Sequence, residues 1–491
     1  MSFNIKKVGV LGTGVMGAQI AAHLSNANIE VYAFDMDQEI SKKGIEGSTK
    51  LKPSPYYNFK SASLISPMNY NDHLEKLKEC DWIIEVISER LDWKQDLYKK
   101  IEPYISENTI VTSNTSGISL SDLSDGMSEK FLSCFFITHF FNPPRYMRLV
   151  EIIKSDKTNN SMVDFMCDFM ESSLGKGVVV AKDTPNFIAN RIGVYGMMVT
   201  LEEAMSKKMS IEDVDSLTGT LIGRPKSATF RTADVVGLDT MAFVANTAYT
   251  KCADDKDREV FNIPDYIKTM LDNKWLGQKT KQGFYKKIDK GVIHSLDLNT
   301  LEYKPMNKKR YDAFALAKER TYLKDRLNVI VRSDDVAGEF LWNCFSRTLC
   351  YASDLVGVIA DDVVSIDNAM KWGFGWEFGP FEVLDAIGLD YFIDRLRKEN
   401  RAIPSFLLEI QSKKLSSVYK WIDGSRYFYC LETKEYSAIK NHQKFMNYLS
   451  LKTFDKTIKA HWSASLVDLG DSVAGIELHS VLKPELNPID G

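Results

Sequence analysis

A histidine and a glutamate that could move a proton lie in neighbouring apolar runs of this sequence. His139 follows the run Phe135-Phe-Ile-Thr, and Glu151 lies inside the next run, Leu149-Val-Glu-Ile-Ile. A histidine accepts protons well near neutral pH. A carboxylate on its second ring nitrogen fixes the tautomer and stabilises the imidazolium as it forms. The two residues therefore predict a general base for alcohol oxidation, with the base and its carboxylate on adjacent strands.

A glycine motif near the N-terminus predicts a dinucleotide site. It reads Gly12-Thr-Gly-Val-Met-Gly17, and a strand precedes it while an alanine-rich helix follows from about Val15 to Ser25. In such a loop Gly12 makes the tight turn, Gly14 lets the backbone approach a pyrophosphate and Gly17 lets helix and strand pack closely. The helix N-terminus, with Val15 and Met16, then faces the phosphates.

An acidic residue closes the second predicted strand of this unit. Asp35 follows the run Val31–Phe34. A carboxylate at this place accepts hydrogen bonds from the adenine ribose hydroxyls and repels a 2′-phosphate. The sequence therefore predicts NAD rather than NADP as the cofactor.

Further polar residues stand at or just after apolar runs. Glu85 ends Trp82-Ile-Ile-Glu, Ser116 closes Ser113-Asn-Thr-Ser, and Asn142 comes shortly after His139. Ligands of open parallel sheets bind outside the carboxyl ends of the strands, so these residues are candidates for a site. Any one of them alone could be a hydrogen-bonded core residue; their shared position favours a site.

The runs that position these residues alternate with amphipathic stretches up to about residue 185, which is typical of a parallel sheet covered by helices. From Pro185 apolar residues recur at helical spacing to about Lys274. We expect an α/β fold with five segments: a Rossmann-type domain over 1–185, a helical domain over 186–285, a hairpin-containing linker over 286–335, a second helical repeat over 336–455 and a tail over 456–491.

The second helical repeat is visible in the sequence itself. Phe230, Asp234 and the Gly237-Leu-Asp triplet recur 151 residues later as Phe381, Asp385 and Gly388-Leu-Asp. A polar-aromatic segment with hairpin alternation follows each copy, at 285–303 and at 419–436. The helical domain is therefore predicted to be duplicated. In the tail, two short strands are predicted around a Gly-Asp turn.

Composition excludes several classes of protein. The 491 residues carry a formal charge of −4, which gives no reason to expect nucleic acid as a partner. Seven cysteines occur without a CxxC pair, so neither a disulfide framework nor a zinc site is expected, and we predict no metal. The sequence shows no signal peptide and no apolar run near the roughly 20 residues of a membrane span. We therefore expect a cytoplasmic protein without membrane insertion.

Several motifs together resemble the L-3-hydroxyacyl-CoA dehydrogenases over residues 6 to about 290. They are Gly-x-Gly-x-Met-Gly, Ser-Asn-Thr-Ser, His-Phe-Phe-Asn-Pro with Leu-Val-Glu, Asp183-x-Pro-x-Phe-Ile-x-Asn-Arg191, and Lys279-Thr with Gly283-Phe-Tyr. The resemblance implies oxidation of the 3-hydroxyl of a fatty acyl-CoA by NAD in β-oxidation. It also implies a Rossmann-type domain followed by duplicated all-α C-terminal domains, as in the longer members of the family.

The resemblance also implies residue roles. His139 is similar to the family's general base, Glu151 to its orienting carboxylate, and Ser116 and Asn190 to the residues that hydrogen-bond the substrate. The nicotinamide side of the cofactor site is implied to contain Glu85, Asn142 and Lys279. CoA is implied to meet Ser48 and a lysine, with Lys50 and Lys52 both open because Pro53 and Pro55 interrupt the usual helix. Arg90 and Lys281 depart from the family pattern, which more often has asparagine and glycine at these places.

The remaining parts allow alternatives. We interpret the second repeat as structural and Asn343, which echoes Asn190, as a packing residue; whether the chain also forms a homodimer stays open. The tail resembles the first strands of an enoyl-CoA hydratase of the crotonase type, which predicts a truncated or split fusion with a hydratase domain or partner. Rival functions are oxidation of 3-hydroxybutyryl-CoA or 3-hydroxyadipyl-CoA in another pathway, of a small 3-hydroxy acid or a sugar nucleotide, or a silent NAD-binding relic.

Overall fold

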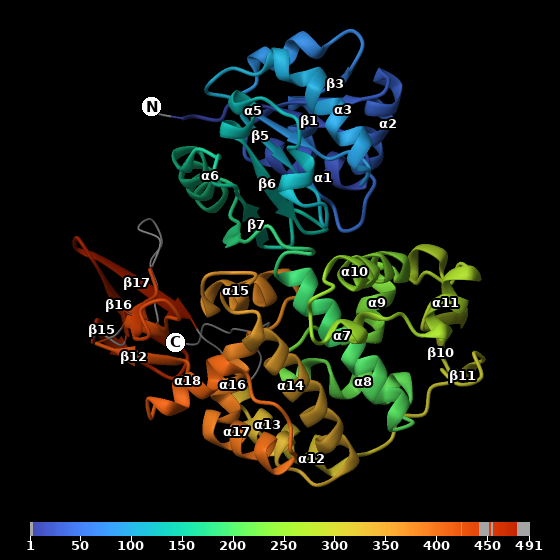
Figure 1. The fold of residues 1–491 in the computed structure, drawn as a ribbon, viewed down its shortest axis with the longest axis vertical. Helices are drawn as coiled ribbons and strands as arrows, with labels where there is room; N and C mark the ends of the chain where they lie inside the picture. The colour runs from blue at the N-terminus through green and yellow to red at the C-terminus, as the bar shows by residue number, and fades with distance from the viewer. Residues whose placement is uncertain (1–2, 424, 441–450, 453–454, 479–491) are drawn as a thin grey trace.

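An eight-stranded sheet carries both the glycine motif and the His139–Glu151 pair. The computed structural model describes residues 3–423, 425–440, 451–452 and 455–478. The sheet, drawn in blue to green at the top of Figure 1, has the strand order β3-β2-β1-β4-β5-β6-β7-β8. Its strands are β1 (Lys7–Leu11), β2 (Glu30–Asp35), β3 (Ile65–Asn69), β4 (Trp82–Glu85), β5 (Ile110–Ser113), β6 (Phe135–Phe140), β7 (Leu149–Ile153) and β8 (Gly177–Ala181).

The direction of the strands changes once across this sheet. Neighbouring strands from β3 to β6 are parallel, β6 and β7 are antiparallel, and β7 and β8 are again parallel to each other. The prediction of a parallel sheet is therefore wrong for its last two strands. The connection 141–148 is too short for a crossover, which needs a dozen residues or more, so the chain can only turn back beside β6.

Helices cover both faces of the sheet, and this explains why β4 to β7 are buried along their whole length. The covering helices are α1 (Val15–Asn26), α2 (Gln38–Ser48), α3 (Leu91–Ile101), α4 (Leu120–Leu123), α5 (Glu129–Cys134) and α6 (Asn160–Ser172). The sequence prediction missed β3, an edge strand that Pro67 interrupts.

The helical region below the sheet contains two copies of one unit (Figure 1). The first copy contains α7 (Ala189–Ser206), α8 (Ile211–Leu217), α9 (Phe230–Val236), α10 (Leu238–Lys251), α11 (Asp265–Asp272) and a sheet of β9 (Tyr285–Asp289), β10 (Val292–Leu296) and β11 (Tyr303–Pro305). The second contains α14 (Val336–Asp354), α15 (Val363–Gly373), α16 (Pro380–Ile387), α17 (Leu389–Lys398), α18 (Ser405–Ser412) and a sheet of β12 (Tyr419–Ile422), β13 (Ser425–Tyr429) and β14 (Tyr436–Ala438). Helices α12 (Asp312–Lys318) and α13 (Leu323–Val331) join them.

Matching hydrogen bonds confirm the predicted duplication. In the first copy the carboxylate of Asp234 accepts hydrogen bonds from the backbone N–H groups of Phe284 and Tyr285. In the second, Asp385 accepts them from Val418 and Tyr419. The glycines that separate the two matched helix pairs both have positive φ, +101° at Gly237 and +98° at Gly388. In both copies, an aspartate carboxylate that accepts two backbone hydrogen bonds thus connects the small sheet to the helices.

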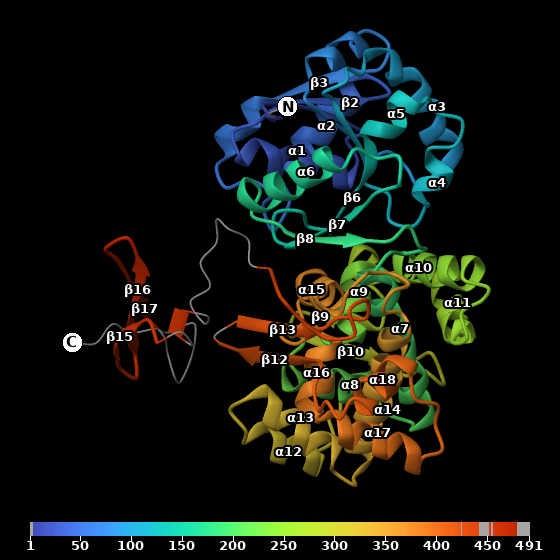
Figure 2. The same cartoon turned by 60° about the vertical axis from the view of Figure 1, so that its left-hand side comes forward.

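A separate small sheet follows at the C-terminal end of the described chain. It contains β15 (Thr457–Ala460), β16 (Ala464–Gly470) and β17 (Val473–Leu478). The predicted strand pair around Gly470 is confirmed, and β15 adds a third strand that the prediction missed. Figure 2 shows this sheet standing to one side of the helical region. In the described part of the chain, none of the helices is both long and apolar enough for a membrane span.

Candidate active site

The glycine loop between β1 and α1 has the shape that a dinucleotide requires. Gly12 has a φ of +105°, and a Cβ atom on Gly17 would lie 1.9 Å from the carbonyl oxygen of Gly12, so neither position tolerates a side chain. Gly14 is exposed with open space around its Cα, and Val15 beside it is 70% exposed. No side chain caps the N-terminus of α1 at Gly14, which leaves its N–H groups for an anionic ligand.

Asp35 is held beside this loop. One carboxylate oxygen accepts hydrogen bonds from the backbone N–H and the hydroxyl of Thr13, at 2.8 and 2.6 Å, and the other accepts one from the N–H of Met36. The side chain thus stands at the end of β2 next to the open loop, where a cofactor ribose would lie. These residues fit NAD as the group they would hold.

The histidine and glutamate predicted to pair are opposite each other on β6 and β7. The Nδ1 atom of His139 lies 2.7 Å from Oε2 of Glu151, and both side chains are buried. The rings of Phe141 and Phe187 lie 4.5 and 5.7 Å from the imidazole ring, centroid to centroid. The structure confirms the predicted pairing, and the hydrogen bond on Nδ1 leaves Nε2 as the atom that can accept a proton.

Glu151 also connects the sheet to the helical region. Its second oxygen, Oε1, accepts hydrogen bonds from the backbone N–H groups of Ile188 and Ala189, at 3.1 and 2.8 Å. These residues begin α7, and Asn190 is the second residue of that helix, half-buried. Asn190 therefore lies in the first turn of the first helix of the helical region. The carboxylate therefore places the start of α7 next to the histidine.

Ser116 is fixed by a glutamate that the sequence analysis missed. Glu89 accepts hydrogen bonds from the backbone N–H groups of Ser116 and Gly117 and from the hydroxyl of Thr115, at 2.9, 3.1 and 2.5 Å. Burial raises the pKa of Glu89, but the charge of Lys94 and these hydrogen bonds outweigh burial and hold the pKa below its ordinary value. Glu89 is therefore an ionised group beside the loop that follows β5.

Glu85, the glutamate that the sequence analysis selected, lies inside the protein. It is fully buried, and its oxygens accept hydrogen bonds from Lys94, Tyr98 and Ser113 at 2.6 to 2.7 Å. Its role on the nicotinamide side stays a prediction. The signal that could have favoured Glu89 is its position in the loop after β4, whereas Glu85 is the last residue of the strand.

The two other residues expected near the nicotinamide lie in different regions. Asn142 is exposed just after β6, and its side-chain oxygen accepts a hydrogen bond of 3.2 Å from Gln19 of α1. This places Asn142 beside the helix of the glycine loop. Lys279 forms an ion pair with Asp239 of α10, in the helical region, and the structure brings it to no other predicted site residue. Their contacts with a cofactor stay predictions.

The residues expected to meet CoA differ in exposure. Ser48 ends α2, is 2% exposed and hydrogen-bonds the carbonyl of Ile45 and the hydroxyl of Tyr56. Lys50 and Lys52, which follow the end of that helix, are exposed. Of the three, only the two lysines offer a free surface for a ligand in this structure.

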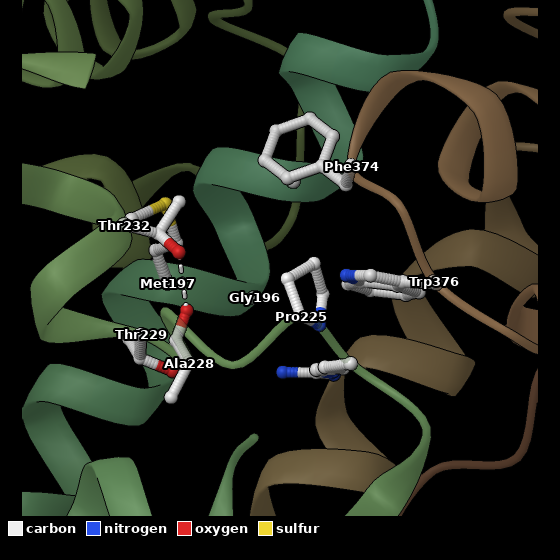
Figure 3. A pocket seen from close by; sticks show the side chains of 10 residues that line it. Gly196, Met197, Pro225, Ala228, Thr229, Thr232, Phe374 and Trp376 are labelled. Carbon is white, nitrogen blue, oxygen red and sulfur yellow. Dashed lines mark hydrogen bonds between the residues drawn. The ribbon is translucent and has the colours of Figure 1, made fainter. Parts of the chain in front are cut away.

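A small cavity lies in the helical region (Figure 3). Its volume is about 30 Å³, room for about two water molecules. Gly196 and Met197 of α7 form one wall, and Phe374 and Trp376 of the second copy form another. The guanidinium of Arg224 stacks on Trp376 at 4.2 Å. The cavity marks the junction of the two copies.

The fold and these side chains define a nicotinamide-dependent dehydrogenase. A Rossmann-type sheet presents a glycine loop, an acidic residue after β2 and a His–Glu pair at one edge, and a helical region begins at that pair. The chain belongs to the 3-hydroxyacyl-CoA dehydrogenase family. Residues 7–184 match its NAD binding domain, and residues 187–287 and 343–409 match its C-terminal domain.

Individual relatives agree with this assignment. A probable 3-hydroxyacyl-CoA dehydrogenase of Bacillus subtilis is 45% identical over 98% of this chain, which spans 63% of that relative. Another, from Deinococcus radiodurans, is 44% identical over 58% of this chain and 83% of its own length. The solved 3-hydroxybutyryl-CoA dehydrogenase of Escherichia coli shares the fold, with a TM-score of 0.61 and 20% identity over 83% of this chain and 98% of that one.

Proposed function

We propose that this chain oxidises the 3-hydroxyl group of an acyl-CoA to a ketone. NAD, when bound at the glycine loop, supplies the acceptor for the hydride that leaves C3. The single observation that carries the proposal is the hydrogen bond of 2.7 Å between His139 and Glu151, because it prepares a proton acceptor at the sheet edge where the cofactor loop opens.

The chain's own residues account for the proton. Nε2 of His139 accepts the proton of the 3-hydroxyl as the carbonyl forms, and Glu151 stabilises the resulting imidazolium. Ser116 and Asn190 orient the substrate oxygen from the loop after β5 and from α7. Glu151 stays in place during the transfer because the N–H groups of Ile188 and Ala189 hold its other oxygen.

Oxidation of NADH by acetoacetyl-CoA, the reverse reaction, tests the proposal. We expect turnover with acetoacetyl-CoA and none with free acetoacetate, because the CoA part supplies binding energy that a small acid lacks. Equal turnover with the free acid would favour a small-acid dehydrogenase. No oxidation of NADH with either compound would favour an NAD-binding relic and overturn the proposal.

His139→Ala separates catalysis from cofactor binding. Because the histidine acts on the proton and the glycine loop holds the cofactor, we expect turnover to fall at least about a hundredfold. The affinity for NADH, measured by fluorescence titration, should stay close to that of the wild type. An equal loss of turnover and NADH affinity would mean that His139 is a structural residue.

Several finer expectations accompany this proposal and stay predictions. They are a role in β-oxidation, the cytoplasmic location and a hydratase that acts with this chain.

A further inference from the structure

The second helical copy packs against the last strands of the sheet through the end of α15. The ring of Trp372 covers Gly177 of β8, where a Cβ atom would lie 2.4 Å from the ring, and Arg148 stacks on the same ring at 4.6 Å. Nearby, the backbone N–H of Lys182 donates a hydrogen bond of 2.9 Å to the carbonyl of Ile359. We call residues 372–374 the wedge, because they enter between the sheet and α7.

Gly373, in the middle of the wedge, lies close to three residues that contact or flank the His139–Glu151 pair; we call these three residues the supports. A Cβ atom added to it would lie 2.6 Å from Cδ2 of Leu149, 3.3 Å from Cβ of Ala189 and 3.6 Å from the ring of Phe141. Leu149 precedes Glu151 on β7, Ala189 donates a backbone hydrogen bond to Glu151, and Phe141 packs on the imidazole of His139. All three therefore lie within contact distance of the position that a side chain at residue 373 would take.

Phe374 completes the wedge on α7. Its ring lies so close to Gly193 that a Cβ atom there would be 2.0 Å from it. Figure 3 shows this ring lying against α7 at one end of the small cavity. Gly193 follows Asn190 by one helical turn, so the ring presses on the part of α7 that carries Asn190. The wedge thus touches β7, β8 and α7 together.

We propose that the wedge of the second copy positions the His139–Glu151 pair and Asn190 for catalysis. Residues 372–374 are positioning residues, since they touch the supports of the reacting groups and not the groups themselves. The second copy, which we interpreted from the sequence as structural, thus contributes to the geometry of a site that the sheet and the first copy form. This inference rests on the proposed function, because its measure is turnover.

The physical reason is the closeness of packing at Gly373. The methyl group of an alanine there cannot stay 2.6 Å from Cδ2 of Leu149, so the buried Leu149 side chain must turn into its neighbours, and the 3.3 Å contact with Cβ of Ala189 must widen by a few tenths of an ångström, which shifts the start of α7. A displacement of about 1 Å at reacting groups can cost about a hundredfold in rate, even when the substitution is remote from the chemistry.

Gly373→Ala is the direct test. We expect kcat for NADH oxidation by acetoacetyl-CoA to fall about ten- to a hundredfold. The KM for NADH should change little, because Gly12 and Gly17 of the glycine loop pack against each other and against Val86 and Ile87, and not against the wedge. The double variant Gly373→Ala/Leu149→Val should recover most of kcat, since valine lacks the Cδ2 atom that the new methyl group meets.

A matched glycine provides the control. Gly196 of α7 also faces the second copy, but a Cβ atom there would make only ordinary contacts of 3.5 Å with Thr348. Gly196→Ala should therefore leave kcat and both KM values unchanged. If Gly373→Ala does not give folded protein, Trp372→Leu, which removes the ring from Gly177, supplies the second variant, with a several-fold lower kcat and an unchanged NADH affinity.

The outcomes separate the two proposals. An active wild type with an unaffected, folded Gly373→Ala overturns the positioning role alone. A loss that Leu149→Val does not relieve, or one that raises the KM for NADH in proportion, means that the wedge only stabilises the fold, and this also overturns the positioning role. A wild type that does not oxidise NADH overturns the proposed function and, with it, this inference.

Discussion

Glu85 and Glu89 stand close together in the sequence and share Lys94, but their other hydrogen-bond partners differ. Both follow the apolar residues of β4, and the sequence pattern does not show which one stays inside. Glu85 is buried because Lys94 and Tyr98, later in the chain on α3, reach back to it. Glu89 has passed the end of the strand and meets the loop after β5. The His139–Glu151 pair was predictable because adjacent strands need only two neighbouring apolar runs.

A single buried residue, His23 on α1, should make the stability of the folded protein depend on pH. Neither ring nitrogen has a hydrogen-bond partner among the described residues. Burial, and then the charge of Lys176, lowers its pKa from 6.5 to about 3. Between these values the unfolded chain binds a proton that the folded chain does not, so this residue makes stability fall as the pH falls from about 6.5 to about 3.

His23→Leu should remove this sensitivity, since leucine fits an apolar site and takes no proton. We expect the stability of the variant relative to the wild type to rise by about 2 kcal/mol between pH 7.5 and pH 5. Urea denaturation at several pH values measures the difference. A difference that does not vary with pH would contradict the assignment.

Among the elements, the repeat was the most predictable and the direction of β7 the least. Glycine, aspartate and aromatic residues recur at one offset because both copies need the same backbone bend and the same carboxylate contacts. The direction of β7 depends on the length of one connection, which an apolar pattern does not reveal. Edge strand β3 was missed because Pro67 stands in its middle, and tail strand β15 because it is only four residues long.

The carboxylates that fasten the small sheets allow a matched prediction. Burial raises the pKa of both Asp234 and Asp385 to about 6, and each accepts two backbone hydrogen bonds. Asp385→Ala leaves two N–H groups without their acceptor, so we expect a loss of about 2 to 4 kcal/mol in unfolding free energy. Asp234→Ala should cost a similar amount.

Exposed Asp390, one helix later, is the control for this measurement. Asp390→Ala should cost less than about 1 kcal/mol, because it removes only a charge from the first turn of α17. Thermal denaturation of the three variants gives the comparison. An equal loss of unfolding free energy at positions 385 and 390 would show that the buried hydrogen bonds of Asp385 do not add to stability.

At the scale of the whole molecule, contacts between residues far apart in the chain could not be predicted from the sequence. The fold class follows from periodicity and motifs, but the approach of Gly373 to Leu149 joins residues far apart in the chain. No pattern in either segment predicts it, because a glycine at the end of a helix is common. The contact between Gly373 and Leu149 becomes visible only in the three-dimensional structure, where the second helical copy packs against the sheet.

The sheet of β15 to β17 gives a prediction at this scale. Its strands hydrogen-bond to one another, and Figure 2 shows it apart from the sheet edge that carries His139. A chain ending at residue 440 should therefore keep the kcat and KM values for acetoacetyl-CoA and NADH within about twofold. Steady-state kinetics on the shortened and full chains test this, and a large loss of kcat would show that the tail supports the site.

Glu151 has a consequence for how this protein tolerates mutation. One of its oxygens hydrogen-bonds to His139, and the other accepts hydrogen bonds from the backbone at the start of α7. A single side chain is therefore needed both for catalysis and for the attachment of the helical region to the sheet. In a library of variants at this position, loss of turnover and loss of domain attachment should not separate. Glutamine is the exception, because its oxygen can keep the two N–H groups of α7 while its N–H₂ group donates to Nδ1 of His139; the ring proton then lies on Nε2, and the proton acceptor is lost although both hydrogen bonds remain.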